Sequence, residues 1–152
     1  MLNRRKMLSH SARVAAMLAT VGLLPQAAHA AYNAPAFEIK TMAELIKSLG
    51  GGAPTETKDI TVTAPDIAEN GAVVPVGVST ALPGVKKLLV LVEKNPSVLS
   101  AIFNVTDAID ANVSTRVKMG QSSNVYAVAM MADGKVLFAQ KEVKVTLGGC
   151  GG

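Results

Sequence analysis

The stretch VYAVAMMADGKVLF, residues 125–138, contains the clearest indication of the fold in this chain. Two apolar runs, residues 125–131 and 135–138, flank the pair Asp133-Gly134. An Asp-Gly pair between apolar runs is typical of a β-hairpin, because glycine readily adopts the positive φ angle that a tight hairpin turn requires. The stretch therefore predicts two antiparallel strands joined by a short turn.

Short apolar runs of the same kind lie on both sides of this hairpin. Residues 60–63 alternate Ile and Val with Thr, and residues 88–92 are continuously apolar, as a strand covered on both faces would be. Further strands are expected at residues 74–78, 101–105, 113–119 and 143–147. Turn signals separate several of these runs, among them Asn70-Gly71. Short strands with turns at this spacing predict an all-β protein with a β-sandwich, which we place at residues 59–147.

One short helix is expected ahead of the strands, within a leader at residues 31–58. Thr41 and Glu44 have the spacing of a capping box, in which the side chains of the two residues satisfy backbone groups at the start of a helix. One helical face is apolar and a glycine run follows it: Met42, Leu45, Ile46 and Leu49, then Gly50, Gly51 and Gly52. The sequence thus predicts a short helix that packs its apolar face on the body of the protein and ends at the glycines.

Residues 1–30 have the features of an export signal. A basic start is followed by a mildly apolar run at residues 14–24, and Ala28 and Ala30 are small residues at the two positions that a signal peptidase reads. The apolar run is too short and too rich in alanine for a transmembrane span. We therefore expect cleavage after Ala30 and no membrane anchor.

The adjacent Arg4 and Arg5 resemble the twin-arginine type of export signal. Met7 stands where that signal usually has phenylalanine, so the agreement is incomplete. An export signal of this type predicts that the mature protein is periplasmic.

Removal of the signal changes the charge of the protein. The whole chain has a formal net charge of +4, but four of its 15 Lys and Arg residues lie in the signal, and the remaining eleven balance eleven Asp and Glu residues. The basic character therefore belongs to the signal, and it does not indicate a nucleic-acid partner.

The mature chain also lacks the residues that many catalytic sites require. Both histidines, His10 and His29, leave with the signal, and a single cysteine remains. This inventory excludes a histidine-dependent triad, a Cys-His dyad and a His-ligated zinc site, and it disfavours a conventional hydrolase or oxidoreductase. Asp107 and Asp110 lack the dense oxygen-ligand spacing of a calcium loop, and we interpret them as solvated loop acids.

The single cysteine, Cys150, lies in a tail of glycines. Its neighbours are Gly148, Gly149, Gly151 and Gly152. Glycine has no side chain and a permissive backbone, so this sequence predicts a flexible, unshielded stalk for the thiol. From Leu147 the sulfur could extend on the order of 10 Å beyond the body. An odd cysteine in an exported protein indicates either a free reactive thiol or intermolecular pairing, and both interpretations remain open on these residues alone.

The ending KVTLGGCGG, residues 144–152, closely resembles the C-terminus of the SoxY family, the sulfur carriers of the periplasmic thiosulfate-oxidising (Sox) system of bacteria. The resemblance extends to residues 115–117 and to residues 125–129 with Asp133-Gly134 after them. The export signal, the mature size and the lone cysteine agree with it, so the resemblance covers essentially the whole chain.

The resemblance implies an immunoglobulin-like β-sandwich that forms a heterodimer with a small β-subunit, SoxZ. It implies that Cys150 is the covalent attachment point for sulfur intermediates, held as an S-thiosulfonate and related adducts. The carrier would dock transiently with the haem cytochrome SoxAX, the manganese hydrolase SoxB and, where present, the sulfane dehydrogenase SoxCD. It would hold no cofactor or metal and would not be catalytic alone.

Other functions explain the tail less well. In a structural or binding subunit, Cys150 would only form a disulfide-linked dimer, and this is the main alternative. A ubiquitin-like carrier activated as an adenylate agrees poorly with export away from ATP and with the strand-rich pattern. A prenylation box is absent, because Cys150 is third from the end rather than fourth.

Overall fold

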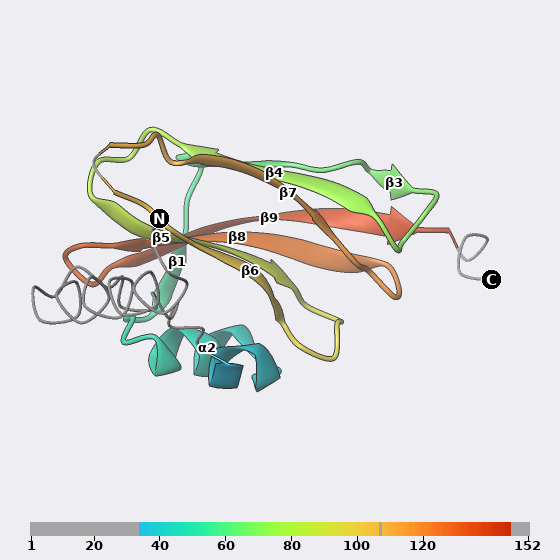
Figure 1. Ribbon diagram of the computed structural model, residues 1–152, viewed down its shortest axis with the longest axis horizontal. Helices are drawn as coiled ribbons and strands as arrows, with labels where there is room; N and C mark the ends of the chain where they lie inside the picture. Colours follow the sequence, from blue (N-terminus) through green and yellow to red (C-terminus); the bar gives the residue numbers. More distant parts are fainter. Residues whose placement is uncertain (1–33, 107, 147–152) are drawn as a thin grey trace, which may run out of the picture. The chain divides into compact units, whose positions relative to one another are not determined.

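Two β-sheets make up most of the part of the chain that the computed structural model describes, residues 34–106 and 108–146 (Figure 1). These residues belong to the compact unit Asn33–Gly152, and the second unit, Met1–Tyr32, lies outside the described residues. The helical elements are the 3₁₀ helix η1 (Ala34–Glu38) and the α-helix α2 (Met42–Ser48). The strands are β1 (Pro54–Glu56), β2 (Ile60–Thr63), β3 (Ile67–Ala68), β4 (Val74–Thr80), β5 (Val85–Val92), β6 (Leu99–Asn104), β7 (Asn112–Val117), β8 (Ser123–Met131) and β9 (Val136–Val145).

The sheets differ in size and in how their strands are paired. The larger sheet has the strand order β1-β9-β8-β5-β6, with β3 also paired to β9, and the smaller sheet has the order β2-β4-β7. β1 and β3 run parallel to β9, and the other neighbours are antiparallel. The sheets lie one over the other as the two layers of a sandwich (Figure 1). The predicted all-β, immunoglobulin-like β-sandwich is confirmed.

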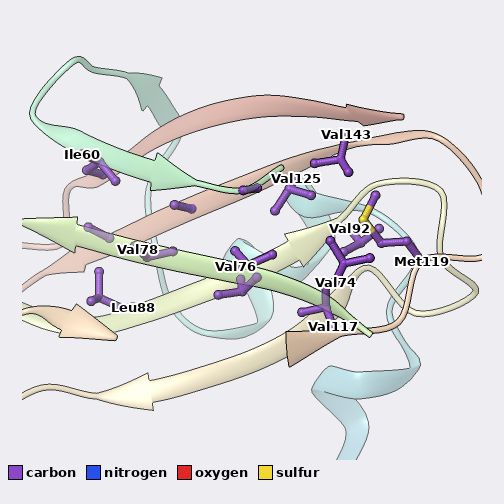
Figure 2. Close-up of a cluster of buried hydrophobic side chains, with 14 of the residues drawn as sticks. Ile60, Val74, Val76, Val78, Leu88, Val92, Val117, Met119, Val125 and Val143 are labelled. Atoms are coloured by element: carbon purple, nitrogen blue, oxygen red, sulfur yellow. The ribbon is translucent and has the colours of Figure 1, made fainter. Parts of the chain in front are cut away.

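The main core lies between the two sheets (Figure 2). It is built largely from valine side chains on alternating strand positions, such as Val76 and Val78 of β4 and Val125 of β8. Branched side chains of this kind pack well on a pleated surface, so the alternation in the sequence translates directly into one buried face. Met119, between β7 and β8, is fully buried and closes the end of this core that lies towards the C-terminus.

A second apolar cluster lies on the other face of the larger sheet, where α2 covers it. Leu45 and Ile46 of α2 pack there with Leu89 and Leu91 of β5. The neighbouring residues Leu88, Val90 and Val92 of the same strand belong to the inter-sheet core. The continuously apolar run at residues 88–92 is thus confirmed as a strand covered on both faces.

The β8–β9 hairpin is confirmed. Gly134 has a φ angle of 85° at the turn, and the backbone N–H of Met131 donates to the carbonyl of Lys135 over 2.9 Å. The two strands expected at residues 135–138 and 143–147 are, however, one continuous strand, β9, of ten residues. The polar residues 140–142 contain no glycine, proline or asparagine that would turn the chain, and they continue the ladder with β8. Leu147 lies outside the described residues.

The predicted helix forms with its caps. The Thr41 hydroxyl oxygen accepts a hydrogen bond from the backbone N–H of Glu44 over 3.3 Å, and the hydroxyl donates to the Glu44 carboxylate over 2.8 Å. At the other end Gly50 has a φ angle of 79°, and the N–H of Gly51 donates to the carbonyl of Ile46 over 2.9 Å. This is the Schellman arrangement, in which glycine supplies the left-handed residue. No helix among the described residues is long and apolar enough to cross a membrane.

The segment expected as a leader, residues 31–58, also contributes to the sheet. Its part from residue 34 onward contains η1, where Ala36 is buried, then α2, and then β1, which pairs with β9 through Pro54, Thr55 and Glu56. The sheets therefore include residues before position 59, where we placed the start of the sandwich. β1 has only three residues and no apolar alternation, so its strand conformation comes from pairing with β9 rather than from its own sequence.

Candidate functional site

The structure describes the chain up to Thr146, four residues before Cys150. Cys150 and the glycines at positions 148, 149, 151 and 152 lie outside the described residues, and so do the export-signal residues Arg4, Arg5, Ala28 and Ala30. The site that can be built from described residues is therefore the base of the tail, which we define as Val145 and Thr146 with the groups that contact them.

The tail base lies at the C-terminal end of β9. Figure 1 shows β3 beside this end of the strand, while β1 and the β8–β9 turn lie at the other end. β9 is paired with β8 along most of its length, from Ser123↔Val143 to Met130↔Val136. The residues that lead to the tail are thus a continuation of a strand inside the larger sheet.

Hydrogen bonds on both edges hold the tail base. On one edge, the N–H of Val145 donates to the Ser122 hydroxyl oxygen over 2.9 Å, which extends the contact with the β8 side past the last ladder pair. On the other edge, Val145 is paired with Ala68 of β3, and the N–H of Thr146 donates to the Ala68 carbonyl over 3.1 Å. The Thr146 hydroxyl lies 3.5 Å from the carbonyl oxygens of both Ala68 and Glu69. The chain is therefore fixed up to Thr146.

Charged groups near the tail base are few and exposed. Lys144 is exposed on β9 opposite Ile67, and Lys141 forms a 3.0 Å ion pair with the exposed Asp66. In the described part of the chain, no three His, Cys, Asp or Glu residues are grouped so that they could hold a metal ion. The arrangement supplies a hydrogen-bonded start for the tail.

Two residues in other parts of the fold, Tyr126 and Asp133, have shifted pKa values. Partial burial raises the pKa of Tyr126, in the middle of β8, and the negative charge of Glu93 adds to this effect. Hydrogen bonds from the side chain and the backbone N–H of Lys135 lower the pKa of Asp133, in the β8–β9 turn. Of the two loop acids, Asp110 is exposed, as expected for a solvated group, and Asp107 lies outside the described residues.

Sequence reasoning did not identify the residues that hold the tail base. Asn70-Gly71 was recognised as a turn, but its approach to Met119 and Val145 depends on the packing of distant segments. Ser122 gave no signal, because a serine before a strand is common and its partner is 23 residues away. A two-residue strand such as β3 is below the length at which alternation can be detected.

Comparison with known proteins identifies a matching family model and similar solved structures. The family model "Sulfur oxidation protein SoxY" matches residues 46–150. The sulfur carrier protein SoxY from Chlorobium limicola f thiosulfatophilum is 35% identical, with a TM-score of 0.63, over 71% of this chain and 97% of that chain. No curated protein matches.

A superoxide reductase (neelaredoxin) from Ignicoccus hospitalis has a TM-score of 0.55 over 71% of this chain and 100% of that chain, at 17% identity. This likeness shows a shared fold alone. The family match covers more than half of the chain and includes β1 to β9, the tail base and Cys150. The chain therefore belongs to the SoxY family of sulfur oxidation proteins.

Proposed function

We propose that this chain is a covalent carrier of sulfur intermediates in thiosulfate oxidation, with the thiol of Cys150 as the attachment point. The observation that carries the proposal is the extent of the family match, which runs to residue 150 and so includes the cysteine and the glycines before it. The similar protein from Chlorobium limicola is described as a sulfur carrier, which supports the same role here.

The chemistry of the cargo explains why the attachment residue is a cysteine. Sulfur–sulfur bonds form and break at thiolates. Loading joins the Cys150 thiolate to the outer sulfur of thiosulfate, giving Cys–S–S–SO₃⁻, and releases two electrons to a haem cytochrome. Hydrolysis with one water then releases sulfate and two protons and leaves Cys–S–S⁻. Loading needs a partner that accepts the two electrons, and hydrolysis needs a partner that activates the water, because this chain supplies only the thiol.

The fold and the tail have different tasks in this scheme. The sandwich is the part that partners recognise, and the tail carries the sulfur into their active sites. Cys150 is four positions after Thr146, so its Cα lies at most about 14 Å beyond that of the last fixed residue. A stalk of glycines suits entry into several different active sites, because it is narrow, uncharged and conformationally permissive.

We further propose the partners and location that this role requires. The chain is exported to the periplasm by a twin-arginine signal in residues 1–30, and there it forms a heterodimer with a SoxZ-like subunit. It docks transiently with the cytochrome SoxAX, the manganese hydrolase SoxB and, where present, the sulfane dehydrogenase SoxCD. The carrier holds no cofactor and catalyses none of these steps alone.

Substitution of the cysteine tests this proposal against the disulfide alternative. Cys150→Ser keeps the size of the side chain and removes the thiol, so we expect complete loss of thiosulfate-dependent respiration in cells that depend on this chain. Immunoblots of the periplasmic fraction control for export and abundance, and non-reducing electrophoresis of the unsubstituted protein reports any covalent dimer. A Cys150→Ser strain that respires thiosulfate at the normal rate would overturn the carrier role, and loss of a disulfide-linked dimer as the only change would favour the alternative.

A further inference from the structure

The connection between β2 and β4 is longer than the fold requires. The two strands are antiparallel neighbours in the smaller sheet, with Thr63 paired to Gly77. Neighbours of this kind are usually joined by a turn of two to five residues. Here residues 64–73, which we call the strap, leave the smaller sheet, pair with the end of β9 in the larger sheet as β3, and return.

The first anchor of the strap is Lys141, in the middle of β9. Its ammonium group donates to the Ala64 carbonyl over 2.6 Å and lies 3.0 Å from the Asp66 carboxylate. The second anchor is β3 itself, where the N–H of Lys144 donates to the Asp66 carbonyl over 2.9 Å and the N–H of Thr146 donates to Ala68. The first anchor attaches the strap to the middle of β9, and the second attaches it to the last residues before the tail.

The third anchor is Gly71, and it depends on the absence of a side chain. The N–H of Met119 donates to the Gly71 carbonyl over 2.7 Å. A Cβ at position 71 would lie 2.3 Å from the Met119 carbonyl oxygen and 2.8 Å from Cγ1 of Val145. Gly71 does not have a positive φ angle, so glycine is required here for close approach rather than for a special backbone conformation. The contact brings the strap against Met119 and the tail base together.

The strap contributes little apolar burial for its length. Its buried apolar side chains are those of Ala64 and Ala68, whereas the larger Ile67 is 58% exposed and Val73 is 51% exposed. A segment whose main purpose was to stabilise the core would place these large side chains inside. The strap instead makes backbone contacts that converge on Val145 and Thr146, and Ser122 holds Val145 from the opposite edge.

From these contacts we infer that the strap is a clamp that fixes where the tail begins, with Gly71, Ser122 and Thr146 as positioning residues for transfer at Cys150. This inference rests on the proposed carrier function. Each residue released from the clamp adds about 3.5 Å to the reach of the thiol and widens the volume it samples. A wider volume lowers the effective concentration of the thiol at a partner's active site. The clamp therefore balances how far the thiol reaches against how often it meets that active site.

Three substitutions by alanine separate a positioning role from a general loss of stability. Gly71→Ala forces the strap away from the tail base. Gly51→Ala is the matched control, because its Cβ would be similarly crowded, 2.7 Å from Val136 and 2.8 Å from Ile46, but at the opposite end of β9. Ser122→Ala is a milder second variant that removes only the acceptor for the Val145 N–H, and it serves if Gly71→Ala does not fold.

The first readout is a nitroxide label on Cys150 of the full mature chain, which has this one cysteine. We expect Gly71→Ala and Ser122→Ala to raise the mobility of the label and Gly51→Ala to leave it unchanged, when the variants are compared at equal distance below their melting temperatures. Equal mobility in Gly71→Ala, Ser122→Ala and Gly51→Ala would overturn the clamp. This measurement involves no sulfur transfer, so failure of the clamp can be distinguished from failure of the proposed carrier function.

The second readout is rescue of a shortened tail. Deletion of Gly148 removes about 3.5 Å of reach, and we expect it to slow loading by thiosulfate and the partner cytochrome at least tenfold. Adding Gly71→Ala or Ser122→Ala to the deletion should restore loading at least threefold, because a released residue replaces the deleted one. Adding Gly51→Ala should restore nothing. A purely structural strap would make both double variants slower than the deletion alone, and that result would also overturn the clamp.

Discussion

The outer edge of β9 is covered at both ends by a short parallel strand, and the two ends are covered in different ways. At the start of β9, β1 pairs with the strand, and Gly51, just after α2, packs against Val136 and Ile46, which are almost completely buried. At the end of β9, β3 is held by backbone hydrogen bonds, and its Ile67 is exposed. Strand pairing is present at both ends, but apolar side chains of α2 add burial at the first end, and hydrogen bonds to the strap and Ser122 add position at the second.

The difference predicts that changes at the start of β9 alter folding stability and leave the tail unaffected, while changes at its end do the reverse. Each substitution below is therefore measured twice, by urea unfolding and by the mobility of a nitroxide on Cys150. We expect the loss of stability to decrease from Leu45→Ala through Gly134→Ala to Thr146→Val.

Leu45→Ala, in the helix α2 that covers the larger sheet, should have the largest effect on stability. The side chain is fully buried between α2 and the larger sheet, so its truncation leaves a cavity and costs about 2–5 kcal/mol of unfolding free energy. Mobility of the label on Cys150 should not change in the folded protein. A stability loss below about 1 kcal/mol would show that α2 is not integral to the fold.

Gly134→Ala in the β8–β9 turn should cost about 1 kcal/mol. The residue has a φ angle of 85°, in the left-handed region that a residue with a Cβ adopts only with strain. Gly120→Ala is the control, because Gly120 has no positive φ and no atom within 4 Å of an added Cβ. Equal stability of the two variants would contradict the assignment of strain to the turn.

Thr146→Val at the tail base should cost less than about 1 kcal/mol of stability, because the hydroxyl contacts are long, at 3.5 Å. It should nevertheless raise the mobility of the Cys150 label, by less than Gly71→Ala does. Thr115→Val on β7 is the matched substitution on another strand of the sandwich, where label mobility should stay constant. A larger stability loss in Thr146→Val than in Leu45→Ala would reverse the proposed difference between the two ends of β9.

Loss of the Asp133–Lys135 pair at low pH should have the smallest effect on stability, and this pair also lies near the start of β9. Lys135 lowers the pKa of Asp133 in the fold below its ordinary value of 3.8, so the charged carboxylate stabilises the folded state above pH 3.8. That contribution is lost as the pH falls from 3.8 through the lower pKa of the folded state. Asp133→Asn should therefore slightly reduce the dependence of the melting temperature on pH between pH 4 and pH 2. The same pH dependence in the variant and the unsubstituted protein would show that the Asp133–Lys135 pair contributes nothing to stability.

The sequence predicts local features of this fold better than the contacts between distant segments. The β8–β9 hairpin, the caps of α2 and the doubly buried β5 follow from short-range patterns, and the structure confirms all three. β1 and β3 were not predicted, because each has two or three residues and is a strand only through pairing with β9. The continuity of β9 was missed because a polar stretch resembles a break in the apolar pattern.

The candidate site divides in the same way. Cys150 was predicted as the attachment point from the sequence alone, because a lone cysteine among glycines is unusual, and this prediction concerns a residue outside the described part of the chain. The tail base was not predicted, because Gly71, Ser122 and Thr146 form no motif in the sequence. Their contacts arise only where three segments of the fold approach one another. Contacts between segments more than 20 residues apart leave no local pattern from which they could be predicted.

The most direct test of the account is the intact mass of this protein purified from the periplasm of cells respiring thiosulfate, with purification under acid conditions that prevent thiol exchange. We predict a mature chain beginning after residue 30, with part of the population heavier by a thiosulfonate or by sulfane sulfur, and with these adducts removed by reductant and absent from Cys150→Ser. A population that carries only the unmodified thiol, or adducts that persist in Cys150→Ser, would contradict the carrier function.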